Sequence, residues 1–169
     1  VNVMKHVKDE FGGRVDLRGF RSKAGDQVLK YYKLDNYLRE NFGKVLVEIN
    51  SNSPFLAGQM QSGKFEFLLI APATSNTVAK IAMGITDSML SNAAIMGLKA
   101  YVPIYVMPSD YAEGKIVTKL PSGKDLELKI RKEDADNVRK LAQMDGMSVI
   151  EKPEAIYDVF KKRFGSTKK

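Results

Sequence analysis

Hydrophobic and polar positions along this chain follow two periods, which together predict an α/β protein. Apolar runs of strand length, most of them rich in β-branched residues, occur at 15–17, 45–49, 67–71, 102–107 and 147–150. Apolar residues with helical spacing occur at 3–11, 28–32, 34–42, 78–83, 89–98, 133–144 and 153–164. Strands that alternate with helices in this way are typical of a parallel sheet.

The period changes between residues 115 and 130. Two segments, 115–120 and 125–130, alternate apolar and charged residues and flank a turn that contains Pro121 and Gly123. This pattern predicts a β-hairpin with one face in water. We therefore expect a parallel α/β core with a β-hairpin excursion near 115–130.

The length of 169 residues, 44% of them hydrophobic, suits one domain with a full core. We expect a single domain over residues 1–164 and a disordered tail over 165–169. A βαβ unit opens with a strand, whereas the first periodic segment here is a helix. We therefore also expect a first strand to be missing upstream of Val1.

Composition excludes several classes of chemistry. The chain has no cysteine and one histidine, His6, so thiol nucleophiles and thiolate-bound metals are excluded and we expect no metal site. We interpret His6 as structural or incidental. No apolar run reaches the length of a membrane span and no leader-like segment opens the chain, so we expect a cytoplasmic protein without membrane contact.

The net charge of +7 favours anionic partners. The basic residues are spread along the chain without interleaved aromatic residues, so we do not expect nucleic acid among them. An acidic redox protein or a phosphorylated or polyglutamylated small molecule would be attracted equally well.

The candidate chemistry lies between residues 65 and 94. We expect the strand at 67–71 to stop at Pro72, which cannot donate to a sheet ladder, and Ala73-Thr74-Ser75-Asn76-Thr77 then leads into a helix. Ser109 and Asp110 follow the next strand, so they share the same sheet edge. In open α/β sheets ligands bind at this edge, where helix N-termini offer free N–H groups. A helix cap needs fewer polar side chains than this turn contains, so we favour a binding site over a simple cap. We expect Asp87, later in the segment, to cap a second helix.

The sequence contains no hydrolase triad, phosphate-binding Walker loop, paired-carboxylate site or dinucleotide glycine fingerprint. Catalytic residues therefore stay unassigned. The absence of catalytic acids and bases favours chemistry that is carried out by a bound cofactor.

The same residues resemble a known family. Ala71-Pro72-Ala73-Thr74-Ser75-Asn76-Thr77 and the later Gly84-Ile85-Thr86-Asp87 are similar to the PASANT-type motif and the GxAD segment of the FMN-binding flavoproteins. That family includes cysteine decarboxylases, phosphopantothenoylcysteine decarboxylases and flavin prenyltransferases. From about residue 22 to 156 the chain looks most like the archaeoflavoprotein and dihydromethanopterin reductase branch, with further likeness at 22–25, 52–58, 102–105 and 120–121.

The resemblance implies a three-layer α/β/α Rossmann-like (flavodoxin-like) fold, assembled as a homo-oligomer of trimers or a trimer-based shell, with FMN between subunits. It implies that Thr74, Asn76 and Thr77 contact the flavin or its ribityl chain. It also implies that Ser22 contacts the phosphate end and that the loop 52–55 closes the site. The cofactor-binding residues expected on this basis are Ser22, Ser53, Ala73, Thr74, Asn76, Thr77, Asp87 and Ser109.

Two departures from the family pattern disfavour cysteine decarboxylation. The decarboxylases carry a catalytic histidine about where Gly58 stands, and a PAMN-type clamp where this chain has Met107-Pro108-Ser109-Asp110. A flavin prenyltransferase is also less expected, because Ser109-Asp110 replaces the Arg-Glu of its Met-Pro-Arg-Glu segment.

The resulting hypothesis is an FMN-dependent oxidoreductase that passes electrons from a ferredoxin-like donor to a dihydropterin substrate, as a dihydromethanopterin reductase does. The basic surface suits an acidic donor. The alternative is an FMN electron carrier without a dedicated substrate, and it needs the same FMN site.

Overall fold

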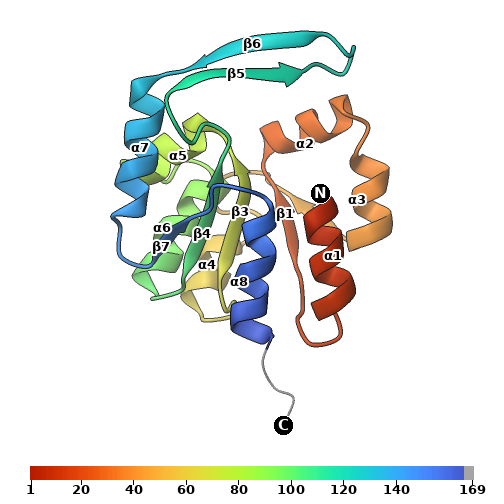
Figure 1. The fold of residues 1–169 in the computed structure, drawn as a ribbon. Coiled ribbons are helices and arrows are strands. Elements are labelled where there is room, and N and C mark those ends of the chain that lie inside the picture. Colours follow the sequence, from red (N-terminus) through yellow and green to blue (C-terminus); the bar gives the residue numbers. More distant parts are fainter. Residues whose placement is uncertain (166–169) are drawn as a thin grey trace. The chain divides into compact units, whose positions relative to one another are not determined.

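The computed structural model describes residues 1–165, in which helices alternate with strands (Figure 1). The described chain forms two compact units, one of residues 1–47 and 150–165, the other of Glu48–Val149. The single domain expected over 1–164 stays a prediction. Most of the expected disordered tail, residues 166–169, lies outside the described residues. No helix within 1–165 combines the length and the apolar character that crossing a bilayer requires.

The first unit pairs two short strands in parallel, with Gly19 opposite Val45 and Arg21 opposite Val47. Its elements are α1 (Asn2–Phe11), β1 (Gly19–Arg21), α2 (Lys23–Tyr31), α3 (Asp35–Phe42), β2 (Val45–Val47) and α8 (Glu154–Phe164). The prediction of a strand at 15–17 was wrong: the strand begins at Gly19. The side chain of Val45 lies against Gly19, where a Cβ would be 3.0 Å from Cγ2 of Val45.

Helices α1 and α8 pack together through aromatic side chains. Phe11 and Phe160 are buried, with ring centroids 6.0 Å apart. His6 stacks on Tyr157 at 5.1 Å, and the Tyr157 hydroxyl donates to the carboxylate of Glu10 at 3.0 Å. His6 thus takes part in helix packing, in line with its interpretation as a structural residue.

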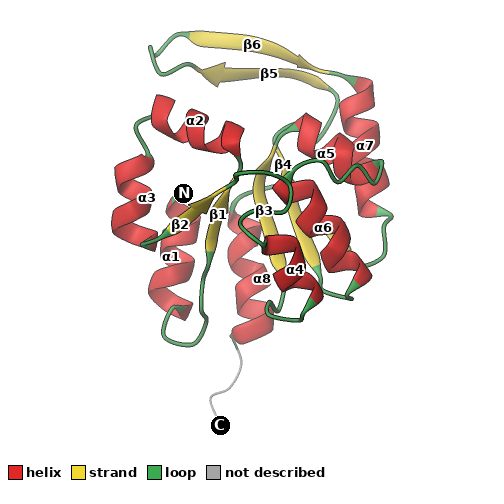
Figure 2. Ribbon diagram, turned by 180° about the vertical axis from the view of Figure 1, so that it is seen from behind, coloured by secondary structure: helices red, strands yellow, loops and turns green. Residues whose placement is uncertain are grey.

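The second unit is built on a parallel sheet in the order β3-β4-β7. Helices α4 and α6 lie on one face of this sheet (Figure 2). The elements are α4 (Leu56–Gln61), β3 (Leu68–Ala73), α5 (Ser75–Ala82), α6 (Met89–Lys99), β4 (Ile104–Pro108), β5 (Gly114–Lys119), β6 (Asp125–Ile130), α7 (Lys132–Ala142) and β7 (Met147–Val149). The predicted parallel α/β fold is confirmed.

Strand β4 forms the middle of this unit, with Ile104 and Val106 fully buried. Helix α6 comes close to it at Gly97, where a Cβ would lie 2.8 Å from Cδ1 of Ile104 and 2.8 Å from Cε of Met60. Only a glycine fits at this junction of helix, strand and α4 without displacing a neighbour.

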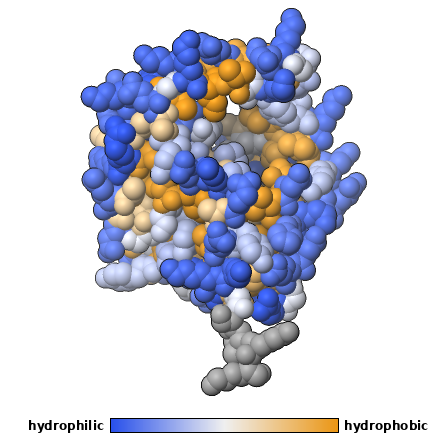
Figure 3. Space-filling model, viewed as in Figure 1, coloured by the Kyte–Doolittle hydropathy of each residue, from blue (hydrophilic) through white to orange (hydrophobic). Residues whose placement is uncertain are grey.

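The predicted hairpin is confirmed as the antiparallel pair β5-β6, with Ile116 opposite Leu128 and Thr118 opposite Leu126. These residues share one face of the ribbon, because side chains alternate along a strand. Lys115, Glu127 and other charged residues occupy the opposite face. The expectation that one face alone lies in water was wrong, because every residue of the two strands except Ile130 is exposed. Figure 3 shows apolar side chains gathered over the hairpin at the top of the view.

Two further predictions need correction. Strand β3 does not stop at Pro72 but runs to Ala73, because the register with β4 shifts between Ile70 and Ala73 and the proline lies at that irregularity. Helix α4, which buries Leu56 and Met60, is absent from the predicted helices.

Candidate functional site

The turn after β3 has the geometry of a helix N-cap. Thr74 has φ −67° and ψ 158°, and its Oγ1 accepts the N–H of Thr77 at 3.4 Å. The two threonine hydroxyls lie 3.3 Å apart. Asn76, in the first turn of α5, is exposed, as is Thr74. Thr74 alone therefore caps α5. The side-chain amide of Asn76 is left in solvent, beside the N–H groups at the start of the helix.

A second turn, after β4, joins the first. The N–H of Ser109 donates to the carbonyl of Ala73 at 2.8 Å. The carboxylate of Asp110 accepts hydrogen bonds from the hydroxyls of Ser75 and Ser109. Asp110 lies at the predicted sheet edge, although neither it nor Ser75 is among the predicted cofactor-binding residues. The contacts identify Asp110 as the group that holds the two turns together.

Asp87 forms an ion pair with Lys80 at 2.9 Å, between the end of α5 and the start of α6. The expectation that Asp87 caps α6 was wrong. Ser88 does so instead, in a reciprocal capping box in which its hydroxyl accepts the N–H of Ser91 and the Ser91 hydroxyl accepts the N–H of Ser88. The role of Asp87 in cofactor binding stays a prediction.

Ser53 is half-buried in a tight turn. Its carbonyl accepts the N–H of Ile49 at 2.7 Å, and its N–H donates to the carbonyl of Asn50 at 3.1 Å. The turn is thus closed by backbone bonds, and the hydroxyl of Ser53 is not needed for them.

Phe55 follows this turn and is 66% exposed, with its ring lying on Gly58 of α4. A Cβ on residue 58 would overlap the ring carbons of Phe55. The position at which the decarboxylases are expected to carry a histidine is therefore filled here by an aromatic ring from the same loop.

Ser22, in the first unit, caps α2: its Oγ accepts the N–H of Gly25 at 2.9 Å. Among the eight predicted site residues, the structure joins Ala73, Thr74, Thr77 and Ser109 through direct contacts, with Asn76 adjacent in α5. Ser53 and Asp87 are held by partners of their own.

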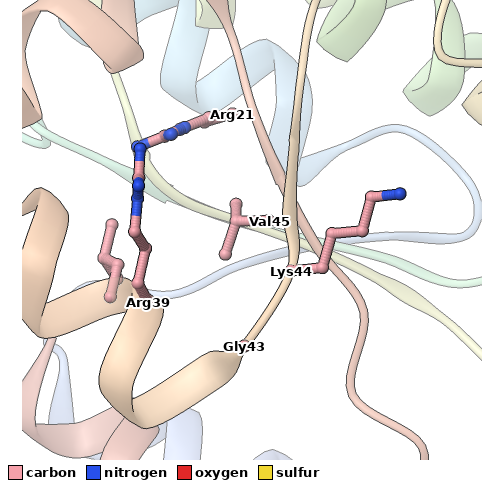
Figure 4. Close-up of a pocket in the computed structure, with 6 residues that line it drawn as sticks. Arg21, Arg39, Gly43, Lys44 and Val45 are labelled. Atoms are coloured by element: carbon pink, nitrogen blue, oxygen red, sulfur yellow. The ribbon is translucent and has the colours of Figure 1, made fainter.

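The first unit contains a hollow of about 310 Å³ lined by basic side chains (Figure 4). Arg21 and Arg39 lie side by side there, and Lys44 points away from them. Both arginines form ion pairs with Asp35, at 2.5 and 3.0 Å. The hydrogen bond from Arg21 lowers the pKa of the Asp35 carboxyl below its usual value. Since the charges are paired, we interpret this cluster as structural.

Within the described residues 1–165, no group of three or more His, Asp or Glu side chains is arranged to hold a metal ion.

Comparison with known proteins gives close relatives over nearly the whole chain. An uncharacterized protein of Methanocaldococcus jannaschii is 43% identical over 162 residues, covering 96% of this chain and 86% of the relative. A dihydromethanopterin reductase (acceptor) of the same organism is 28% identical, covering 94% of this chain and 88% of the relative.

Solved structures give the same picture. The structure of Burkholderia xenovorans DmrB in complex with FMN, described as a cubic protein cage for redox transfer, superimposes with a TM-score of 0.75. It is 28% identical, with 94% of this chain and 88% of DmrB covered. This likeness supports the Rossmann-like α/β fold. Residues 34–164 match the family model named Flavoprotein. The resemblance seen at residues 71–77 is thereby confirmed, and the chain belongs to the Flavoprotein family.

Proposed function

We propose that this protein is an FMN-dependent oxidoreductase that passes electrons from a ferredoxin-like donor to a dihydropterin. The proposal is supported by family membership, by the relative named dihydromethanopterin reductase and by the likeness to DmrB, whose structure was solved with FMN. When bound, FMN would supply the electron-transfer chemistry, and the protein would supply binding and orientation.

The observation that carries the proposal is the exposed amide of Asn76 next to Thr74 at the start of α5. An amide offers both a donor and an acceptor, which suits the carbonyl oxygens and N–H of a flavin ring. The adjoining N–H groups of the helix start favour oxygen-rich or anionic groups. The residue types present therefore fit FMN.

The remaining assignments rest on the resemblance. It gives Thr74, Asn76 and Thr77 to the flavin or its ribityl chain, and Ser53, Ala73, Asp87 and Ser109 to the cofactor without naming the part that they contact. Ser22 would hold the phosphate, because it caps the nine-residue helix α2, whose N-terminus suits an anion.

The proposed partners follow from charge and composition. The net charge of +7 suits an acidic, ferredoxin-like donor, and the chain has no cysteine with which to bind an iron–sulfur cluster of its own. We further propose a homo-oligomer built from trimers, as suggested by the cage described for DmrB.

The test has two stages. First, the purified protein is titrated with FMN and binding is followed by flavin fluorescence. We expect Asn76→Ala to weaken binding by about tenfold, the loss of one or two hydrogen bonds. Asn137→Ala, in helix α7 of the same unit, is the matched control and should leave binding unchanged. A wild-type protein that takes up no FMN would overturn the proposal.

In the second stage the FMN-loaded protein is reduced anaerobically and dihydromethanopterin is added. Reoxidation of the flavin with formation of the tetrahydro product supports a reductase. A flavin that stays reduced, yet is reoxidised by an electron-accepting protein, would instead identify an electron carrier.

A further inference from the structure

We propose that Asn92 of α6, together with Glu48, positions the turn of residues 50–53 and thereby sets the place of Ser53 in the FMN site. The role of Ser53 in that site rests on the proposed function; the positioning of the turn does not.

Asn92 is a buried polar residue with a specific pair of acceptors. Asn92 as a whole is only 8% exposed. Its amide nitrogen donates to the carbonyl of Ser51 and to Oδ1 of Asn52, both at 3.0 Å. Burying an amide is costly unless its hydrogen bonds are made, so this geometry is strongly favoured over alternatives in which the turn moves away.

Glu48 provides a second tie to the same helix. Its carboxylate accepts the N–H of Met89 at 2.7 Å, in the first turn of α6. Met89 and Asn92 are three residues apart, so they lie on one face of the helix. Segment 48–53 is thereby attached to α6 at two places, at Glu48 and at residues 51–52.

The turn between these two ties also has hydrogen bonds of its own. Asn50 accepts the N–H of Asn52 through its side-chain oxygen at 2.9 Å and receives the N–H of Ser53 at its carbonyl. Ser53 follows Ser51 and Asn52 directly and its N–H is bonded to Asn50, so a shift of the two tied residues would move Ser53 with them. The bonds that Asn92 makes therefore help to set the position of Ser53.

The neighbourhood of Asn92 argues against a purely packing role. Along α6 the buried residues around it are apolar or small, including Met89, Ala93 and Ala94. An apolar side chain would be cheaper to bury there, whereas an amide whose nitrogen donates to two acceptors favours one arrangement of the turn. The turn that it holds is flanked by Ile49 and Phe55, which are 65% and 66% exposed.

The first experiment measures hydrogen exchange in the protein without added FMN, in peptides that cover residues 48–55. We expect Asn92→Ala to speed exchange there by about tenfold, with little change in β3 and β4. Asn41→Ala is the matched control, because its amide also donates to a backbone carbonyl, that of Tyr37 at 2.8 Å, in α3. Unchanged exchange in 48–55 would overturn the positioning role.

The second experiment measures FMN affinity and the visible circular dichroism of the bound flavin. Asn92→Ala should weaken binding by about tenfold and alter the flavin spectrum, whereas a merely structural residue would lower the unfolding temperature and leave the flavin signal of the folded protein intact. Normal affinity and spectrum in a folded Asn92→Ala protein would overturn the link to the site.

Glu48 keeps the proposal testable if Asn92→Ala does not fold. Glu48→Gln retains an acceptor for the Met89 N–H and should behave as wild type, whereas Glu48→Ala should show faster exchange and weaker FMN binding. Equal behaviour of the two variants would contradict the proposal. If the wild-type protein binds no FMN, the proposed function has failed, and the exchange measurements alone decide whether Asn92 positions the turn.

Discussion

Ser75 donates its hydroxyl hydrogen to the carboxylate of Asp110, so that the start of α5 is joined to the turn after β4. Strands β3 and β4 are parallel neighbours, and this bond closes the edge at which both end. A carboxylate that accepts from two hydroxyls on different turns sets the spacing between the turns.

We expect Asp110→Ala to release the turn after β4 and to lower the free energy of unfolding by about 1 kcal/mol, the usual net value of such hydrogen bonds. FMN affinity should fall in parallel, because the hydroxyls of Ser75 and Ser109 would no longer share an acceptor that holds the two turns together. Urea unfolding and FMN titration measure the two effects. Asp110→Asn keeps an acceptor oxygen for Ser75 and should lie closer to wild type; equal loss in both variants would contradict this account.

Gly58 is predicted to tolerate no side chain while Phe55 stays in place. We expect Gly58→Ala to lower the free energy of unfolding by up to about 1 kcal/mol, since the new methyl group overlaps the Phe55 ring and must displace it, and the ring is exposed and can turn toward solvent. Chemical denaturation measures this cost. The double variant Phe55→Ala/Gly58→Ala should recover most of it, and an additive loss would show that the ring is not the obstacle.

Thr74 should contribute through its hydroxyl as the cap of α5. Thr74→Ala is expected to lower the free energy of unfolding by about 1 kcal/mol, as measured by thermal or urea unfolding, because the Thr77 N–H loses its acceptor. Thr74→Ser retains the oxygen and should restore the stability. If Ser and Ala variants were equally destabilised, the methyl group and not the cap would be responsible.

The ion pairs around Asp35 predict a defined acid sensitivity. Its pKa is lowered, first by the hydrogen bond from Arg21, so the carboxylate stabilises the folded state at all pH values above the unfolded pKa of about 3.9. This contribution is lost as the pH falls through the lower folded pKa. We therefore expect the stability difference between wild type and Asp35→Asn to be constant near neutral pH and to shrink below about pH 4.

Urea unfolding at a series of pH values measures this difference. Asp16→Asn is a suitable control, because Asp16 pairs with Arg18 at the surface with a side chain that is 73% exposed. An exposed pair of this kind contributes little. The same acid dependence in both variants would refute the assignment to Asp35.

The sequence predicted those elements whose pattern is set by burial within one segment. Strand β4 and the hairpin β5-β6 have clear apolar periodicity, and the turn after β3 has an unusual density of small polar residues. Strand β1 was misplaced because a glycine opens it, and glycine carries no hydropathy signal. Helix α4 was missed because its six residues are too few to show a helical period.

The contacts between turns could not be predicted. Asn92 reads as one polar residue in an apolar helix, and only the fold brings residues 51 and 52 to it across about 40 positions of sequence. The bond between Ser75 and Asp110 likewise spans two strands and their connection. Spacing along the chain indicates which residues reach the sheet edge, whereas their pairing depends on the strand register.

Gly97 lets the backbone of helix α6 approach strand β4 and helix α4 closely. The ends of the Ile104 and Met60 side chains occupy the space into which a Cβ on residue 97 would project. Asn92 lies five residues away, about 7.5 Å along the axis. A side chain at position 97 would first displace the ends of the Ile104 and Met60 side chains, so its cost would fall on the packing between α6, β4 and α4, away from the turn that Asn92 holds.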